Sequence, residues 1–306
     1  MAHSLSPVDL NGISARPVSR LAPTPSGFLH LGNAVNFLVT WALVRSRGGR
    51  LSLRIDDMDG IRFREDVLED IFRSLDWLGL DWDNGPNGPD EFLKNFSLQS
   101  RRSHYFDQLE FLARKSRKTF TCTCSRSAIK KASTNGLYPH TCRHLNQDFV
   151  PGQNTIRVQV PDQTRIQVNG HDIDLDQTFG DFVLWRRDDQ PAYQLASLVE
   201  DEEAGVNFIV RGADLRESTA AQLYLADLFG FKGFQASAFI HHGLILGRDG
   251  QKLSKSRGAY ALKDIRENGE TAESAFQAAA EVMGLPGAEI NSARALLQAA
   301  ASTLHP

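Results

Sequence analysis

A strand, a helix and a second strand follow one another between residues 18 and 55, and this unit limits the possible folds more than any other feature. Apolar residues predict a short strand at Val18–Ala22, which ends at residues 23–27 because proline and glycine disfavour regular structure. A helix is expected from about Gly32, since apolar residues then recur every three to four positions until Gly48. Leu51–Ile55 predicts the second strand. Together they predict a βαβ unit and therefore a parallel sheet.

A similar alternation returns late in the chain. Apolar runs predict buried strands at Val206–Val210 and Ala238–Leu246, with a helix near Ser218–Phe229 between them. The intervening residues include Thr155–Asp176, whose period-two alternation predicts β-structure. We therefore predict an α/β fold: a split, doubly wound parallel sheet interrupted by an inserted α+β subdomain and followed by a short helical C-terminal tail.

The predicted organisation has four parts. Residues 1–18 form an N-terminal extension, residues 19–100 and 190–260 a Rossmann-like catalytic domain, residues 101–189 the inserted subdomain, and residues 261–306 the helical tail. Alanine-rich composition favours helix in the last part.

Composition excludes several classes of protein. Of 306 residues, 23% are charged and 41% are hydrophobic, which excludes wholesale disorder, collagen and coiled coil. The longest uncharged apolar stretch, Ala34–Val44, is far shorter than the roughly 20 residues of a membrane-spanning helix. The first eighteen residues lack the pattern of a secretory signal, so we expect a cytoplasmic protein with no membrane partner.

Two polar segments follow predicted strands, where open parallel sheets bind their ligands. At the start of the first helix, His30 and Gly32 favour phosphate, which backbone N–H groups and the helix dipole attract. The segment Gly247–Ser256 carries Lys252 and Lys255 between glycines, and two such charges suit a polyphosphate. Considered alone, each segment has a plain structural alternative: a helix-start residue with turn glycines, and a solvated lysine loop.

Taken as a pair and in this order, H-L-G-N (His30–Asn33) and K-L-S-K-S (Lys252–Ser256) resemble the two ATP-binding signatures of class I aminoacyl-tRNA synthetases. Further segments are similar to the glutamyl branch of that family: R-L-A-P-T-P-S-G (Arg20–Gly27), R-I-D-D-M-D (Arg54–Asp59), W-L-G-L-D-W-D (Trp77–Asp83), A-Y-Q-L (Ala192–Leu195) and V-R-G-A-D (Val210–Asp214). The resemblance extends from about Arg20 to about Gly258.

The resemblance implies a role for each matching residue. Arg20 and Arg211 would face carboxylates of L-glutamate and Asp56 its ammonium group, because a guanidinium fork matches a carboxylate. Tyr193 and Thr24 would supply hydroxyl groups. The full implied glutamate site is Arg20, Leu21, Ala22, Pro23, Thr24, Asp56, Tyr193 and Arg211; the implied ATP site is His30, Gly32, Asn33, Lys252 and Lys255, of which His30, Lys252 and Lys255 are catalytic. Mg²⁺ would accompany the ATP.

This sequence departs from the family pattern at two of these positions. The family's serine is Thr24 and its glutamate is Asp56. Each replacement keeps the functional group, but aspartate reaches about one bond less far than glutamate. Structural alternatives exist here too: surface salt bridges for the two arginines, and a helix-capping or solvated carboxylate for Asp56.

Three cysteines, all between Cys122 and Cys142, indicate a metal site, because an odd number of thiols in a chain without an export signal does not suit a disulfide framework. Cys122, Cys124 and Cys142 plus one more donor would complete a tetrahedral structural zinc site. Spacing alone favours His140 or His144 as the fourth ligand. The C-x-C…Y-x₃-C pattern resembles that of the glutamyl-Q tRNA(Asp) synthetases, and this implies Tyr138 instead. Three unrelated buried thiols are the structural alternative.

The modest net charge of −3 conceals a basic segment. Residues 101–142 carry nine lysines and arginines against two acidic residues, so this segment has a charge of +7 and the rest of the chain −10. A solvated charged face is the ordinary explanation for such a run. Beside a metal site on a nucleotide-activating enzyme, however, it is also a candidate contact for an RNA backbone.

The resemblance implies an enzyme that activates L-glutamate with ATP as glutamyl-adenylate, without tRNA, and transfers glutamate to the queuosine base in the anticodon of tRNA(Asp). The 50 residues after Ser256 are too few for the anticodon-reading region of a full glutamyl-tRNA synthetase, so we expect the glutamyl-Q type and a monomer. The alternatives are a truncated glutamyl-tRNA synthetase that charges tRNA(Glu) at its 3′ end, and a non-enzymatic zinc-containing protein that binds RNA.

Overall fold

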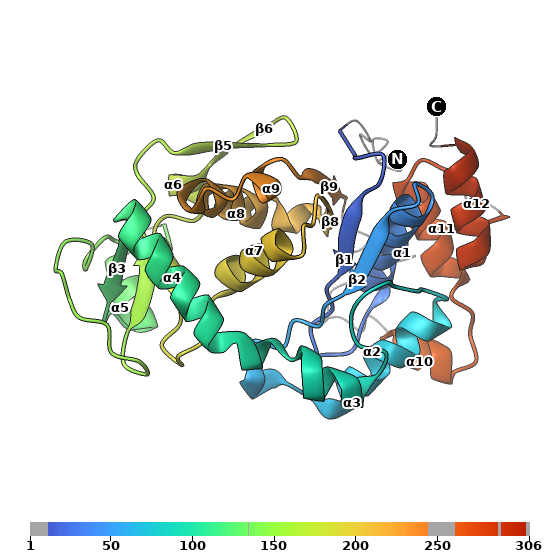
Figure 1. Ribbon diagram of the computed structural model, residues 1–306, viewed down its shortest axis with the longest axis horizontal. Helices are drawn as coiled ribbons and strands as arrows, with labels where there is room; N and C mark the ends of the chain where they lie inside the picture. Colours follow the sequence, from blue (N-terminus) through green and yellow to red (C-terminus); the bar gives the residue numbers. More distant parts are fainter. Residues whose placement is uncertain (1–11, 134, 244–260, 287–288, 304–306) are drawn as a thin grey trace. The chain divides into compact units, whose positions relative to one another are not determined.

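A computed structural model describes residues 12–133, 135–243, 261–286 and 289–303 (Figure 1). Contacts between Cα atoms divide the chain into two units. The first unit takes its described residues from Met1–Leu98, Val206–Asp214 and Ser237–Pro306, and the second from Gln99–Gly205 and Leu215–Ala236. Two short helical turns, η3 (Leu98–Arg101) and η4 (Ala213–Leu215), lie at the joins between the units. Each unit is described separately below.

The first unit contains two parallel strand pairs and the helices that cover them. Its elements are β1 (Val18–Leu21), α1 (Leu31–Arg45), β2 (Arg50–Leu53), η1 (Gly60–Arg62), α2 (Glu65–Trp77), α3 (Pro89–Glu91), η2 (Phe92–Phe96), β8 (Phe208–Gly212), β9 (Ala238–His242), α10 (Leu262–Glu267), α11 (Glu273–Val282) and α12 (Ala293–Thr303).

The parallel pairing that the βαβ pattern predicts is confirmed. β1 pairs with β2 from Val18 opposite Arg50 to Leu21 opposite Leu53, and β8 pairs with β9. The two pairs meet at Asn207, whose backbone N–H donates to the Val18 carbonyl at 3.0 Å while its side-chain oxygen accepts from the Val18 N–H at 2.9 Å. β1 and β8 are therefore neighbours, although more than 180 residues separate them.

Helix α1 lies at the centre of the hydrophobic core of this unit. Its residues from Ala34 to Val44 are buried except Asn36, so nearly the whole circumference is covered. β1, β2 and β8 pack on it, and so do α11 and α12 (Figure 1). Residues 261–306, predicted as a helical tail, thus include helices that are part of the core. Phe276 and Leu296 are buried in the same hydrophobic cluster as α1.

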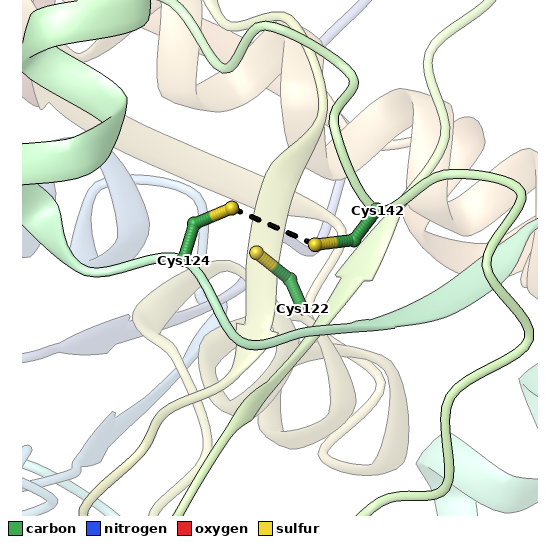
Figure 2. Close-up of side chains that lie close together, drawn as sticks. All are labelled: Cys122, Cys124 and Cys142. Carbon is green, nitrogen blue, oxygen red and sulfur yellow. Dashed lines mark hydrogen bonds between the residues drawn. The ribbon is translucent and has the colours of Figure 1, made fainter.

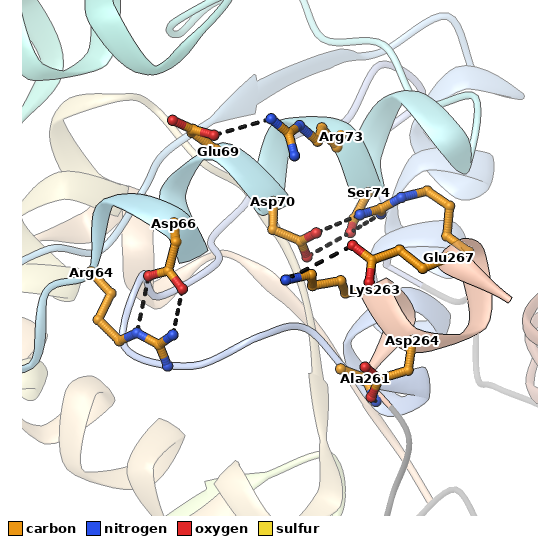
Figure 3. Close-up of polar contacts among 11 residues, drawn as sticks. Arg64, Asp66, Glu69, Asp70, Arg73, Ser74, Ala261, Lys263, Asp264 and Glu267 are labelled. Carbon is orange, nitrogen blue, oxygen red and sulfur yellow. Dashed lines mark hydrogen bonds and ion pairs between the residues drawn. The ribbon is translucent and has the colours of Figure 1, made fainter.

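The end of the chain is also tied to α2 by a polar contact. Arg266 of α10 donates to Asp70 at 2.5 Å and to Ser74 at 2.9 Å. Ser74 in turn lies 3.2 Å from Asp70 on helix α2 (Figure 3). The Asp70 side chain is only 4% exposed. A buried carboxylate needs such a partner, because an unpaired buried charge is costly.

The second unit combines small antiparallel sheets with helices. Its elements are α4 (Arg102–Ser116), β3 (Thr119–Cys122), α5 (Arg126–Ala132), β4 (Thr155–Val158), β5 (Arg165–Val168), β6 (His171–Asp174), α6 (Leu175–Thr178), β7 (Phe182–Trp185), α7 (Tyr193–Glu203), α8 (Arg216–Phe229) and α9 (Lys232–Gln235). β3, β4 and β7 form one antiparallel sheet, and β5 and β6 form a hairpin.

The period-two stretch at Thr155–Asp176 forms the predicted β-structure, as β4, β5 and β6. The division into units differs from the motif-based segments: residues 261–306 belong to the first unit, and α7 and α8, which lie within residues 190–260, pack with α4 of the second unit. No helix among the described residues is long and apolar enough to cross a membrane.

Candidate functional site

The start of helix α1 is organised by His30 and Asn33. His30 is the N-cap: its Nδ1 accepts from the Gly32 N–H at 3.1 Å, and the Asn33 side chain accepts from the His30 N–H at 3.0 Å. These two bonds form a reciprocal capping box. The structural alternative for His30, a helix-start residue, is therefore realised, and the same bonds fix the ring at the end of the helix where a phosphate would bind.

The residues on both sides of 244–260 contact this end of α1. Ala261 forms an antiparallel bridge with His30, and the Leu262 N–H donates to the Leu29 carbonyl at 2.8 Å. On the other side, His242 lies 3.2 Å from the amide of Asn36. Lys252 and Lys255 themselves lie outside the described residues.

His242 is held as a neutral imidazole. Burial lowers its pKa, which the hydrogen bond to the Gly243 carbonyl and the charge of Asp214 only partly oppose. Nδ1 lies 2.9 Å from that carbonyl and donates to it, so Nε2 accepts from the Asn36 amide. Glycine at position 212 leaves space for Asp214, because a methyl group there would lie only 2.5 Å from an oxygen of the Asp214 carboxylate.

The two arginines of the implied glutamate site are both buried in the first unit. Arg20 is 7% exposed in β1 and Arg211 is 3% exposed in β8, on neighbouring strands. Guanidinium groups stay charged when buried, and two of them on neighbouring strands suit an anionic ligand. The structural alternative that the sequence left open, a surface salt bridge, would place these side chains at the surface, whereas both are buried.

The residues that follow Arg20 differ widely in exposure. Leu21 and Pro23 are buried, Ala22 is partly buried, and Thr24 is exposed. The Pro23 carbonyl accepts from the Asp56 N–H at 2.8 Å, which places the R-I-D-D-M-D segment beside the turn after β1.

Asp56 already has a cationic partner. Arg54 Nε lies 2.7 Å from one of its oxygens and a terminal nitrogen 3.2 Å from the other, so the pair is bidentate. The neighbouring Asp57 has a different environment: it is 2% exposed and accepts from the Ser97 hydroxyl at 2.5 Å and the Leu98 N–H at 2.8 Å. Asp56 is thus partly exposed beside Arg54, and Asp57 anchors the chain at residues 97–98.

Tyr193 is the one residue of the implied glutamate site that belongs to the second unit. It begins helix α7, and its side chain is 41% exposed.

The three cysteines come together in the second unit (Figure 2). Their sulfur atoms all lie within 4.8 Å of one another, and those of Cys124 and Cys142 are 3.5 Å apart. Tetrahedral zinc with Zn–S bonds of about 2.3 Å requires sulfur atoms about 3.8 Å apart, so this donor set fits the ion. Cys122 comes from the end of β3, Cys124 from the turn after it, and Cys142 from a distant loop.

Tyr138 lies against this cluster. Its ring is 5% exposed, and its hydroxyl accepts from the Cys142 N–H at 2.7 Å. His140 and His144 are both exposed, and neither belongs to the group of donors that the described residues bring together. Burial and the adjacent thiols of Cys122 and Cys142 raise the pKa of Tyr138, so its hydroxyl keeps its proton without a cation nearby.

The thiols differ in acidity. Burial raises the pKa of Cys142, but hydrogen bonds from Tyr138 and the Thr123 N–H outweigh it and bring the pKa to about 7. Burial and the neighbouring Cys142 raise the pKa of Cys124 to about 11. Hydrogen bonds thus favour one thiolate in this cluster, and a bound cation would favour the others.

Several residues of the basic segment are engaged in the second unit. Arg101 pairs with Glu200 and Glu203, Arg102 with Asp189, and Arg114 with Glu110. Lys115 donates to the Phe229 carbonyl. The charge of +7 is therefore partly neutralised by three acidic residues from outside the segment, Asp189, Glu200 and Glu203.

Comparison with known proteins identifies the family of this chain. The model of the catalytic domain of class I tRNA synthetases (E and Q) matches residues 18–303, so the chain belongs to this family and is a ligase. A relative from Symbiobacterium thermophilum, named Glutamyl-Q tRNA(Asp) synthetase, is 37% identical over 291 residues, which cover 87% of this chain and 86% of the relative. Another from Nocardia farcinica, with the same name, is 36% identical and covers 87% and 85%.

Relatives of a second kind also match. Glutamate–tRNA ligase 2 of Thermoanaerobacter pseudethanolicus is 30% identical over 82% of this chain, and the match spans 53% of that protein. The solved structure of a glutamate tRNA ligase from Elizabethkingia meningosepticum in complex with its amino acid has a TM-score of 0.71 at 21% identity, covering 93% of this chain and 64% of that one. This likeness shows that the fold is that of a class I synthetase catalytic domain.

Proposed function

We propose that this chain uses ATP and Mg²⁺ to activate L-glutamate as glutamyl-adenylate in the absence of tRNA, and then transfers glutamate to the queuosine base in the anticodon of tRNA(Asp). In the first step an oxygen of the glutamate α-carboxylate bonds to the α-phosphorus of ATP, and pyrophosphate leaves. In the second step the acyl group passes to the modified base, and AMP leaves. We also propose a cytoplasmic location, which suits three free thiols.

The observation that carries the proposal is the cysteine cluster with the Tyr138 hydroxyl at its edge. The C-x-C…Y-x₃-C pattern resembles that of the glutamyl-Q tRNA(Asp) synthetases, and this hydroxyl, not His140 or His144, lies against the thiols. The relatives of that name, at 36–37% identity over most of the chain, support the same choice.

Arg20 and Arg211 would bind the carboxylates of glutamate. Both side chains are buried on neighbouring strands, where a guanidinium attracts an anion more strongly than it does in water. Asp56 would receive the ammonium group. Its bidentate contact with Arg54 orients the carboxylate in advance, which lowers the entropy lost on binding.

His30 would bind the phosphates of ATP. Because Nδ1 accepts from the Gly32 N–H, the proton of the neutral ring resides on Nε2, and that nitrogen can donate to a phosphate oxygen. Lys252 and Lys255 would neutralise the charge that builds on the phosphates as pyrophosphate leaves. Mg²⁺ would bind the ATP phosphates and offset their charge.

We further propose that Cys122, Cys124 and Cys142 bind zinc with Tyr138 as the fourth ligand. Zinc in such a site would supply no chemistry of the reaction and would instead link β3 to the distant loop of Cys142. The fit of three sulfur atoms within 4.8 Å of one another supports this role.

A second candidate function is the charging of tRNA(Glu) at its 3′ end. The identity of 30% to a glutamate–tRNA ligase favours it. A protein that binds RNA through a zinc site without catalysis is less well supported, because Arg20, His30, Tyr193, Arg211 and Lys255 are all present.

Two assays separate these functions. We expect the purified protein to exchange pyrophosphate into ATP with glutamate and no tRNA, and to glutamylate tRNA(Asp) that contains queuosine but not tRNA(Asp) that lacks it. Exchange that strictly requires tRNA(Glu), with glutamate attached to its terminal adenosine, would contradict the proposal. Reading which species of unfractionated tRNA becomes glutamylated decides between the acceptors.

A further inference from the structure

Four arginines line one pocket of the second unit, beside the cysteine cluster. The pocket has a volume of about 950 Å³ and contains Arg126, Arg157, Arg186 and Arg187 together with a single carboxylate, Asp188. Its net charge is therefore +3. Cys124 also lines it, so the pocket and the candidate metal centre share the turn that follows β3.

Two of the guanidinium groups are held in place by contacts that the fold supplies. Arg157 lies 4.2 Å from the centre of the Tyr138 ring and donates to the Asp181 carbonyl at 2.9 Å. Arg187 donates to the carbonyls of Thr123 and Cys124 at 3.0 and 3.2 Å. These partners are aromatic faces and carbonyls, which orient a cation and leave its formal charge uncancelled.

The other two arginines complete the charged surface. Arg186 forms an ion pair with Asp188, and Arg126 is exposed on α5. An incoming anion can compete with Asp188 for Arg186, because both partners are about one-third exposed and a pair of this kind is weak in water.

The chemistry of the pocket suits the sugar-phosphate backbone of RNA. Arginine forks bind phosphate oxygens in pairs, and several of them side by side match the repeated charges of a nucleic acid. None of the described residues that line the pocket is aromatic, so it offers contacts to phosphates and no platform for stacking bases.

We propose that this arginine pocket binds the phosphate backbone of the tRNA substrate, on a surface organised by the cysteine cluster. The choice of RNA as occupant rests on the proposed function. Of the four arginines, only Arg126 lies in the basic segment of residues 101–142; the other three come from β4 and from the residues after β7.

The test compares two double variants of equal charge. R126Q/R186Q removes two pocket charges without touching Arg157 or Arg187, which contact the cysteine cluster. R114Q/R165Q removes two exposed arginines of the same unit that are paired with Glu110 and Asp174. The Kd for unfractionated tRNA is measured by filter binding between 50 and about 300 mM salt.

We expect R126Q/R186Q to raise the Kd about tenfold or more and to reduce the slope of log Kd against log salt by about 2, one for each lost phosphate contact. R114Q/R165Q should leave both within about twofold. Equal losses in the two variants, or an unchanged slope, would overturn the proposal. Binding of polyglutamate by the wild type as tightly as tRNA, lost in R126Q/R186Q, would identify a site for acidic peptides and overturn it too.

Pyrophosphate exchange separates this proposal from the proposed function. R126Q/R186Q should exchange pyrophosphate at the wild-type rate with glutamate and no tRNA, because none of the residues that line the pocket belongs to the implied glutamate or ATP site. If the wild type binds tRNA through the pocket but glutamylates no tRNA(Asp), the proposed function fails and the pocket stands. If glutamylation proceeds with full efficiency in R126Q/R186Q, the pocket fails and the function stands.

Discussion

The imidazole ring of His30 packs against Gly32 and leaves too little space for a side chain there. A methyl group at Gly32 would be 3.0 Å from Cε1 and 3.1 Å from Nδ1 of that ring, and the Gly32 N–H is itself the donor that Nδ1 accepts. Glycine at this position is thus a condition for the orientation of His30, and not only for the approach of a ligand to the backbone.

Gly32→Ala is therefore expected to move the His30 ring by a few tenths of an ångström or more. Pyrophosphate exchange should fall about 10- to 100-fold, because small misplacements of catalytic groups are costly. The free energy of unfolding should change by no more than about 1 kcal/mol. Gly88→Ala is the control, since nothing lies within 4 Å of a methyl group there. Equal exchange rates in both variants would contradict the role of His30.

Asp56→Asn should raise the KM for glutamate in the exchange assay about 10- to 100-fold and leave the KM for ATP unchanged. The physical reason is the loss of a charge-assisted hydrogen bond to the ammonium group, which contributes about 1.5–3 kcal/mol. Asp66→Asn provides the control, because Asp66 has a comparable contact with Arg64 at an exposed site. A rise in both KM values would indicate general damage instead of a substrate contact.

Zinc content distinguishes the candidate fourth ligands. We expect Cys142→Ser to abolish stoichiometric zinc and Tyr138→Phe to weaken zinc binding, measured by atomic emission and by competition with a coloured chelator. His140→Ala and His144→Ala should retain zinc, because both side chains are exposed and lie outside the donor group. Release of zinc by either histidine variant, with retention by Tyr138→Phe, would assign the fourth ligand to histidine.

The buried His242 predicts a loss of stability in mild acid. Its pKa is lowered in the folded state, so the unfolded chain binds a proton more readily than the folded chain does. Its contribution is fully present above the unfolded pKa of about 6.5 and is lost as the pH falls below that value. The urea midpoint should fall between pH 7.5 and 5, and it should fall less in His242→Gln. Parallel pH profiles would refute the assignment.

Asp70→Ala should lower the free energy of unfolding by about 3–5 kcal/mol, because it leaves the Arg266 guanidinium without its buried partner. The double variant D70A/R266A should cost less than the sum of the single variants. Glu69→Ala, on the same helix, removes an exposed pair with Arg73 and should cost no more than about 0.5 kcal/mol. Urea unfolding of the four variants measures the coupling.

Hydrophobic periodicity predicted the βαβ unit well, because its strands and helix are bounded by strong turn residues. β1 and α1 begin within one residue of their predicted starts. The packing of α11 and α12 on α1 was not predicted, although a signal for it exists. A helix that is apolar around nearly its whole circumference, as Ala34–Val44 makes α1, must be covered on both sides.

The site was harder to predict wherever neighbouring residues of one type have different environments. Asp56 and Asp57 are adjacent carboxylates, yet one pairs with Arg54 and the other is buried against Ser97 and Leu98. Nothing local distinguishes them, because the partners of Asp57 are 40 residues away. The pocket arginines were missed for the same reason: counting charges along the chain cannot join Arg126 to Arg186.

The burial of α1 has a consequence for synthesis of the protein. Helices α11 and α12, which cover α1, are made more than 220 residues after it. At translation rates of about 5–20 residues per second, the apolar surface that they cover stays open for roughly 10–50 s after α1 is made. During that interval the nascent chain exposes an apolar, aggregation-prone surface. The yield of folded protein in the cell should therefore depend on chaperones, even if the finished protein is stable.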